Sequence, residues 1–215
     1  MILRQAPGIS WARARAALHG SASAPPLWAR GLEDRRAIER CWRLVAAALL
    51  KAIAEVHRAN VAHLDLRPEH VFVAREAGPG AFTVTLLDFS MARELGPAGH
   101  EVASQHTPSV SQQPLRRGPP LPLQDSLRAG LLLAELLFNV PVDFSRAQQE
   151  DLLFLGAEHI PARCAAEIGG GWAPGGAAPD GCASAAAMDL LERLCARDAS
   201  QRLLPSQALY LPIMD

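Results

Sequence analysis

The fold of this chain is decided by the stretch Val61-Ala-His-Leu-Asp-Leu-Arg-Pro-Glu-His-Val-Phe-Val73 and by Thr83-Val-Thr-Leu-Leu-Asp-Phe-Ser90, which follows it. Each stretch surrounds one aspartate with apolar residues, Asp65 in the first and Asp88 in the second. Residues 71–73 and 82–87 are rich in β-branched and aromatic side chains, and a Gly-Pro-Gly turn separates them. This pattern predicts a β-hairpin. We expect short strands to position both aspartates, with Asp65 before the first strand of the hairpin and Asp88 directly after the second.

Two carboxylates delivered in this way suit the transfer of a phosphoryl group. One can orient or deprotonate the attacking hydroxyl, and the other can hold Mg²⁺ against the phosphates of a nucleotide. His63 and His70 flank Asp65, but no third ligand stands at a recognised spacing, so we expect no metal site at this pair. The glycine-rich stretch 169–181 lacks the G-K-[ST] signature that opens a phosphate-binding helix.

Composition narrows the class of protein further. The 215 residues suffice for a sizeable core, and a net charge of -1 gives no overall attraction for nucleic acid or an anionic membrane. No uncharged run is long enough to span a bilayer. Cys41, Cys164, Cys182 and Cys195 are scattered without C-x-x-C spacing, so we expect neither zinc nor a redox dithiol, and reduced thiols in the cytoplasm.

Residues 1–30 combine Arg, Ala, Ser, Gly and Pro, and the first acidic residue is Glu33. We expect a poorly ordered leader, or the remnant of a larger domain truncated at this start. A mitochondrial transit peptide is a minor alternative for an Arg-rich, acid-free start. We assign residues 31–215 to the folded domain.

Helical periodicity appears in several segments of that domain. An apolar stripe between residues 34 and 58 predicts a long helix that ends at Asn60, and a leucine-rich segment beginning at Asp125 predicts a central helix that Asp125 or Ser126 caps. Residues 148–159 are weakly helical, and residues 184–197 and 205–211 predict two terminal helices. Residues 101–124 are polar and then Pro-rich, which indicates a long loop.

The order of these elements and four motifs resemble the C-terminal lobe of a eukaryotic protein kinase. His63-Leu-Asp-Leu-Arg-Pro-Glu-His70 is similar to the catalytic loop H-R-D-L-x-x-x-N, and Asp88-Phe-Ser90 is similar to D-F-G. Asp125 to Gly130 matches the D-x-x-x-x-G opening of the central kinase helix, and residues 190–202 match the closing signature that ends in Arg202. The resemblance implies a mainly helical α+β fold: a kinase-like C-lobe with a short β-hairpin region, and no N-lobe in this chain.

The departures from the kinase pattern affect the residues that kinases use for catalysis and its control. His70 stands in place of the Asn that holds the second Mg²⁺, and imidazole is a poor ligand for this hard cation. Leu64 replaces an Arg, Ser90 replaces a Gly, and Arg67 stands where kinases usually carry Lys. No A-P-E follows, so Arg202 lacks the partner that the resemblance implies. Lys51, the sole lysine, lies within a predicted helix, and no Gly-rich loop or V-A-I-K precedes it. We therefore expect no catalysis and no nucleotide cofactor.

Among degenerate kinases, the D-L-R-x-E-x loop, the D-F-S segment, the missing A-P-E and the Gly/Pro-rich insertion resemble the PEAK-family pseudokinases, the pragmin-like scaffolds, and most closely the shortest of them. This resemblance implies homodimers, or heterodimers with related pseudokinases, formed by a split helical module to which the C-terminal helices contribute. It also implies cytoplasmic, cytoskeleton-associated work in cell motility through adaptors of the Crk and Grb type. The adaptor-binding motifs of that family lie outside the region that this chain resembles.

Several residues carry two interpretations. Asp65 and Asp88 are catalytic groups or, as we favour, structural acceptors that tie the loop to the central helix, with Asp125 working from the helix side. His63 and Phe89 are further motif remnants. Leu191, Leu194 and Cys195 share one helix face, which is a dimer interface or ordinary core. Arg116, Pro119 and Pro122 satisfy the R-x-x-P-x-x-P pattern of an SH3 ligand, or belong to a stiff loop.

Two hypotheses follow. The first is a non-catalytic, kinase-like scaffold that acts through self-association and protein partners. The alternative is an atypical active kinase or phosphotransferase whose N-lobe lies outside this chain. Nucleotide-dependent stabilisation in the presence of Mg²⁺ distinguishes them.

Overall fold

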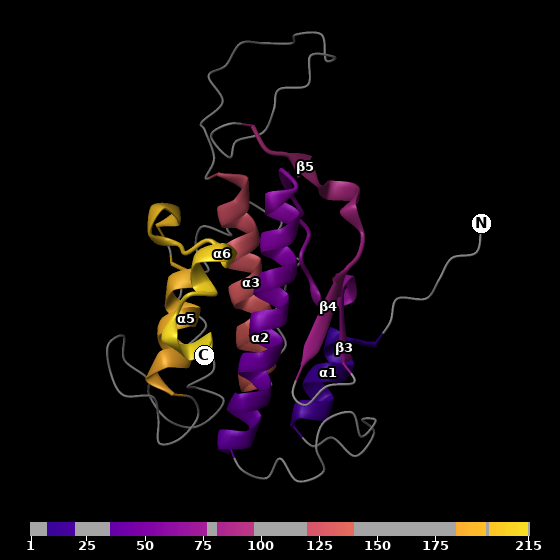
Figure 1. The fold of residues 1–215 in the computed structure, drawn as a ribbon, viewed down its shortest axis with the longest axis vertical. Coiled ribbons are helices and arrows are strands. Elements are labelled where there is room, and N and C mark those ends of the chain that lie inside the picture. Colours follow the sequence, from indigo (N-terminus) through magenta and orange to yellow (C-terminus); the bar gives the residue numbers. More distant parts are fainter. Residues whose placement is uncertain are drawn as a thin grey trace, which may run out of the picture.

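A computed structural model of the chain describes residues 8–19, 35–76, 81–96, 120–139, 184–196 and 198–214. Two long helices, α2 (Arg35–Arg58) and α3 (Leu121–Phe138), run side by side through its middle (Figure 1). Helices α5 (Ala185–Leu194) and α6 (Pro205–Ala208) lie on one side of this pair, and the strands lie with α1 (Trp11–Leu18) on the other. One continuous hydrophobic cluster joins these elements.

Helix α2 confirms the stripe expected between residues 34 and 58. Trp42, Val45, Leu49 and Ile53 are fully buried, and the Trp42 indole Nε1 donates to the carbonyl of Leu133 on α3 at 2.8 Å. This bond satisfies the one polar atom of a buried tryptophan, so the apolar face of α2 packs on α3 without an unpaired donor. Asn60 follows the helix with φ of 59°, the left-handed conformation that Asn tolerates at a helix end.

Helix α3 begins four residues earlier than its sequence pattern predicts. The helix starts at Leu121 with Pro122 in its first turn, where proline is tolerated because the N–H groups of that turn have no helical partner. Asp125 therefore lies inside the helix, and its expected role as the N-cap is wrong. The helix ends at Asn139, whose φ of 58° is again left-handed.

The predicted hairpin is present. Strand β3 (Val71–Arg75) pairs antiparallel with β4 (Phe82–Leu86), with Val73 opposite Val84. A second, short sheet pairs β2 (Val61–Ala62) with β5 (Arg93–Glu94). The 3₁₀ turn η1 (Pro68–His70) leads into β3, and η2 (Phe89–Met91) follows β4, so the two sequence stretches that carry the aspartates converge.

The N-terminal segment differs from the expected leader. Strand β1 (Ile9–Ser10) pairs antiparallel with β3, and α1 follows directly and buries Trp11, Ala14 and Leu18. Gly8 has φ of 105°, and a Cβ there would lie 2.3 Å from the carbonyl oxygen of Val73, so the close approach of the strands requires glycine. For residues 8–19 the poorly ordered leader is thus wrong, because their apolar side chains complete the core.

Helix α1 is held to α3 by polar contacts as well. Arg15 forms an ion pair with the buried Glu135, and the His19 ring Nε2 lies 2.9 Å from the carbonyl oxygen of Leu136. Burial lowers the pKa of His19 and raises the pKa of Glu135 to about 7, although the nearby Arg15 opposes the second shift. A buried, ion-paired carboxyl thus joins two elements that lie far apart in the sequence.

At the C-terminal end, α5 begins at Ser184, whose hydroxyl accepts from the amide of Ala187 at 3.2 Å. Glu39 of α2 accepts from the Ser184 amide at 3.0 Å and fastens this end to the central pair. Short turns η5 (Ala199–Gln201) and η6 (Pro212–Met214) flank α6, so the two predicted terminal helices are confirmed in shortened form. No helix within the described ranges is long and apolar enough to cross a membrane. The predicted helix 148–159 and the Gly-rich stretch 169–181 lie outside the described residues.

Candidate functional site: a kinase-type catalytic loop

Asp125 organises the loop between β2 and η1 from the centre of the molecule. Its side chain is completely buried on α3, and its two oxygens accept from the backbone amides of His63 and Leu64, each at 2.8 Å. His57 at the end of α2 places its ring Nε2 2.9 Å from the same carboxylate. One aspartate therefore ties α2, α3 and the loop together, which is the structural role expected for it from the sequence.

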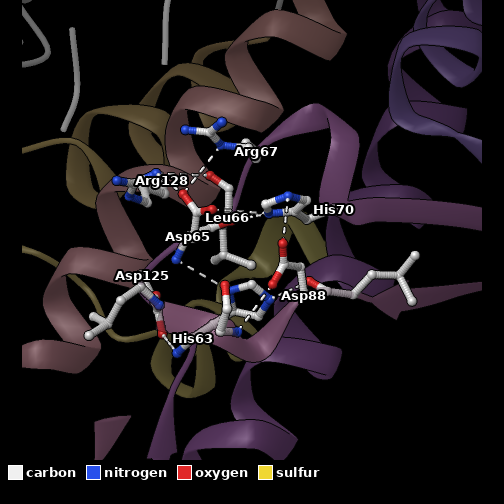
Figure 2. Close-up of polar contacts among 11 residues, drawn as sticks. His63, Asp65, Leu66, Arg67, His70, Asp88, Asp125 and Arg128 are labelled. Atoms are coloured by element: carbon white, nitrogen blue, oxygen red, sulfur yellow. Dashed lines mark hydrogen bonds and ion pairs between the residues drawn. The ribbon is translucent and has the colours of Figure 1, made fainter. Parts of the chain in front are cut away.

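Leu64 takes a strained conformation at this anchor. Its φ of 63° is left-handed, which costs a non-glycine residue on the order of 1–3 kcal/mol. The hydrogen bond to Asp125 holds its amide in that position. The turn directs the next residue, Asp65, away from Asp125 and into a separate group of side chains (Figure 2).

His63 is fully buried and serves as an internal brace. Its Nε2 lies 3.0 Å from the carbonyl of Leu87, and its Nδ1 accepts from the amide of Asp65 at 3.3 Å. The neutral ring with its proton on Nε2 satisfies both contacts. Burial lowers the pKa of His63, in keeping with this neutral form, although the Leu87 carbonyl and nearby carboxylates oppose the shift. The brace connects the loop to the end of β4.

Asp65 is 7% exposed and lies among the side chains of two arginines and a histidine. One of its oxygens lies 3.2 Å from Nε of Arg67 and 3.4 Å from Nη1 of Arg128, and the other lies 3.3 Å from Nδ1 of His70. Arg128 comes from α3 and also donates to the carbonyl of Leu66 at 3.4 Å. Burial lowers the pKa of Arg128, an effect that the Asp65 carboxylate opposes. The carboxylate is engaged by groups of the chain itself.

His70 lies between the two aspartates, as Figure 2 shows. Its Nδ1 is 2.8 Å from the backbone oxygen of Asp65, and its Nε2 is 3.5 Å from the Asp88 carboxylate. Sequence analysis places His70 where kinases carry a metal-binding Asn. Here its ring makes contacts with protein oxygens on both sides.

Asp88 and Phe89 form the outer edge of the site. The Asp88 side chain is 49% exposed, its backbone is left-handed with φ of 59°, and one oxygen accepts from the amide of Ser90 at 3.1 Å. Hydrogen bonds from Ser90 hold the pKa of the Asp88 carboxyl below its usual range. The Phe89 ring packs on His63 at 4.6 Å between centroids, while 44% of the residue stays exposed.

No group of three or more His, Cys, Asp or Glu side chains suited to a metal ion occurs within the part of the chain that the structure describes. The sole lysine, Lys51, lies on the exposed face of α2. The side chains that contact Asp65 are Arg67, Arg128 and His70, and Asp88 meets His70 and the Ser90 amide.

Arg202, from the closing motif, is buried and finds backbone partners. Its Nε donates to the carbonyl of Ala196 at 2.7 Å and its Nη1 donates to the carbonyl of Leu123 at 3.3 Å. Burial lowers the pKa of Arg202. The residue thus joins the end of α5 to the start of α3. The sequence motifs, which link Arg202 to the absent A-P-E segment, gave no indication of this role.

The proposed dimer face is internal. Leu191, Leu194 and Cys195 are at most 4% exposed, and burial raises the pKa of the Cys195 thiol to about 12. A Cβ at Gly130 would lie 2.3 Å from the Cys195 sulfur, which shows how closely α3 and α5 approach. The interface expectation for these three residues is wrong, since the chain itself covers them and the alternative of ordinary core packing holds.

The SH3-ligand motif is only partly visible. Pro122 lies in the first turn of α3, so this end of the motif is helical and the extended polyproline conformation expected there is wrong. Arg116 and Pro119 lie outside the described residues. The prediction of a loop over residues 101–124 fails likewise for residues 121–124, which belong to the helix.

Sequence reasoning missed two residues that complete the site. Arg128 stands three residues after Asp125, inside a run of leucines, and His57 ends an amphipathic helix. A charged residue within a helix that is apolar on most sides signals a buried partner, and this signal could have identified Arg128. Nothing in the pattern around His57 pointed to Asp125.

Comparison with known proteins identifies the family of this chain. The family model of the protein kinase domain matches residues 29–214. Because the match covers most of the chain, the chain belongs to the protein kinase domain family. The kinase-like fold expected from the sequence is thus confirmed at the level of the family.

One curated protein similar to this chain in sequence is human. The chain is 29% identical over 183 residues to the serine/threonine-protein kinase Sgk2 of Homo sapiens, a match that covers 84% of this chain and 43% of that protein. The chain therefore spans less than half the length of this curated relative.

Proposed function

We propose that this chain is a non-catalytic member of the protein kinase family that works as a protein-binding scaffold. In this proposal the kinase fold is kept for its shape, and the residues that once served catalysis now serve stability. The chain corresponds to the C-terminal lobe of a kinase domain.

The surroundings of Asp65 carry the proposal. A general base must reach the hydroxyl of its substrate, yet Asp65 is almost fully buried and lies within 3.4 Å of Arg67, Arg128 and His70. The Asp65 carboxylate is occupied by Arg67 and Arg128, so a substrate hydroxyl would have to compete with them for it. The interactions of Asp65 are those of a structural ion cluster.

Further support comes from the groups that would have to hold a nucleotide. Imidazole at position 70 is a poor ligand for Mg²⁺, and the sole lysine of the chain is on the exposed face of α2. Phosphoryl transfer depends on positioned cations around the phosphates. Arg67 and Arg128, the arginines of this site, contact Asp65 instead.

The finer part of the proposal rests on the resemblance to PEAK-family pseudokinases. By that resemblance the protein forms homodimers, or heterodimers with related pseudokinases, and regulates signalling by adaptors of the Crk and Grb type in the cytoplasm and at the actin cytoskeleton. Residues outside this chain supply the adaptor-binding motifs. A dimer surface lies elsewhere than on Leu191, Leu194 and Cys195, which are buried.

Thermal unfolding of the 215-residue chain with and without ATP and Mg²⁺ tests the proposal. We expect an unchanged midpoint up to millimolar nucleotide, because a ligand that does not bind the folded state cannot stabilise it. A Mg²⁺-dependent rise at micromolar ATP would contradict the scaffold hypothesis. Sedimentation velocity over a range of concentrations tests self-association independently.

The rival hypothesis is an atypical active kinase. Its specific support is the similarity to a protein named as a serine/threonine kinase, together with the retention of both Asp65 and Asp88. Phosphotransfer from labelled ATP to a mixed peptide substrate is the matching assay, with Asp65→Asn as the inactive control. Incorporation that the control variant lacks would favour the rival.

A further inference from the structure

His70 connects the catalytic loop to Asp88 at the exposed edge of the site. His70 touches the catalytic loop on one side, with Nδ1 at 2.8 Å from the Asp65 backbone oxygen, and Asp88 on the other, with Nε2 at 3.5 Å from its carboxylate. The first contact is a hydrogen bond between the ring and a backbone oxygen, and the second is an ion-pair contact with a carboxylate. The imidazole thus spans a gap between two chain segments that are 23 positions apart.

In an active kinase a metal ion and a nucleotide hold the corresponding aspartate. In this chain the His70 ring, 16% exposed, already contacts Asp88. The segment after Asp88 is held mainly by contacts within the turn: Asp88 accepts from the amide of Ser90, Ala92 donates to the carbonyl of Phe89 at 3.0 Å, and Arg93 donates to the carbonyls of Met91 and Ala92. Phe89 packs on His63, and β5, which follows, pairs with β2. The contact of His70 with Asp88 adds a further tie between the turn and the catalytic loop.

We propose that His70 is a positioning residue that takes the place of a ligand, holding Asp88 and the turn η2 against the catalytic loop. The inference deepens the proposed function and rests on it for its biological meaning. A scaffold gains from a surface whose shape is independent of nucleotide. Turn η2 lies at the surface, with Phe89 44% and Met91 48% exposed.

A double-mutant cycle tests the link in the absence of Mg²⁺ and nucleotide. The variants are His70→Ala, Asp88→Asn and the combination of both. Asparagine tolerates the left-handed backbone at position 88 and keeps one oxygen for the Ser90 amide, but it is uncharged and cannot form the ion-pair contact with His70. The readout is residue-resolved hydrogen exchange at the amides of Ser90 and Ala92.

We expect each single variant to accelerate exchange at these amides by about two- to fivefold, the size of a partly exposed ion pair. The double variant should exchange no faster than the faster single variant, because either change alone already breaks the contact. Amides of α5 report global stability and should not change. If alanine at position 70 disturbs folding, His70→Leu, which fills a similar volume but has no hydrogen-bonding or charged group, gives the same cycle.

Two results would overturn the link. One is unchanged exchange at Ser90 and Ala92 when His70 is replaced; the other is a double variant in which the two accelerations multiply, which would show that His70 acts independently of Asp88. Neither result bears on whether the chain binds nucleotide. Conversely, nucleotide-dependent stabilisation would contradict the scaffold proposal and leave the cycle in apo protein unaffected, so the two failures are distinguishable.

Discussion

Asp125 and Asp88 are both aspartates of kinase motifs, yet they lie in opposite environments. Asp125 is completely buried, and both of its oxygens accept from backbone amides of the loop. Asp88 is about half exposed and meets one amide and one imidazole. The first aspartate closely matches its expected motif, D-x-x-x-x-G, while the residues around the second, Ser90 and His70, depart from the kinase pattern.

The difference separates what holds the fold from what performs the chemistry. A buried carboxylate that satisfies backbone amides cannot be replaced without leaving unpaired donors, so the fold itself demands it. An exposed carboxylate whose purpose is to hold a ligand can lose its neighbours at little cost in stability. We infer that this chain keeps the residues that hold the kinase fold together, such as Asp125. We also propose that residues at the former catalytic positions contact one another in place of a ligand.

The largest expected effect is that of Asp125→Ala. The change leaves the amides of His63 and Leu64 without their acceptor and releases the strained backbone of Leu64. We expect a loss of roughly 3–5 kcal/mol in the free energy of unfolding, typical of a broken buried charged network. Urea denaturation followed by circular dichroism measures it.

Asp125→Asn is the matched control for that prediction, because it keeps one of the two acceptor oxygens. We expect it to lose less than the alanine variant. Equal stability of the alanine variant and the unmodified chain would remove the distinction between the buried and the exposed aspartate.

A second buried carboxyl, Glu135, extends the comparison to pH. Its pKa rises from 4.5 to about 7 because it is buried, so between these values the folded chain keeps a proton that the unfolded chain has released. Stability therefore falls as the pH rises through this window and is constant above it. The full effect is on the order of 3 kcal/mol.

Glu135→Gln supplies the reference for this measurement. Below pH 5 the two proteins should be nearly equally stable, and by pH 8 the variant should be the more stable one, since only the parent buries a charge there. Parallel stability profiles from pH 5 to 8 would show that the Arg15–Glu135 ion pair fully offsets the cost of burial.

The smallest expected effect is that of Asp88→Asn. Its side chain is exposed, asparagine keeps an acceptor for Ser90, and the left-handed backbone suits both residues. We expect a change within about 0.5 kcal/mol in the free energy of unfolding. A loss approaching that of Asp125→Ala would place Asp88 in the structural network and remove the distinction between the two sides.

Much of the fold could be predicted because its signals are local. The stripe of α2, the hairpin of β3 and β4 and the left-handed stops at Asn60 and Asn139 depend on spacing and on the conformations that single residues prefer. The start of α3 could not, because Pro122 is compatible with both a loop and a first helical turn. Segment 8–19 was missed for a similar reason: short elements acquire stability from the surface on which they pack.

The sequence by itself determined the family and the identity of the altered residues. His70, Leu64, Ser90 and the single lysine follow from reading the motifs in order. Only the tertiary structure decided what these residues do. It brings Arg128 and Arg67 to Asp65, sets His70 between the aspartates and buries Cys195 between α3 and α5. The physical reason is that ion pairing and burial depend on distances between segments far apart in the chain, which no local pattern encodes.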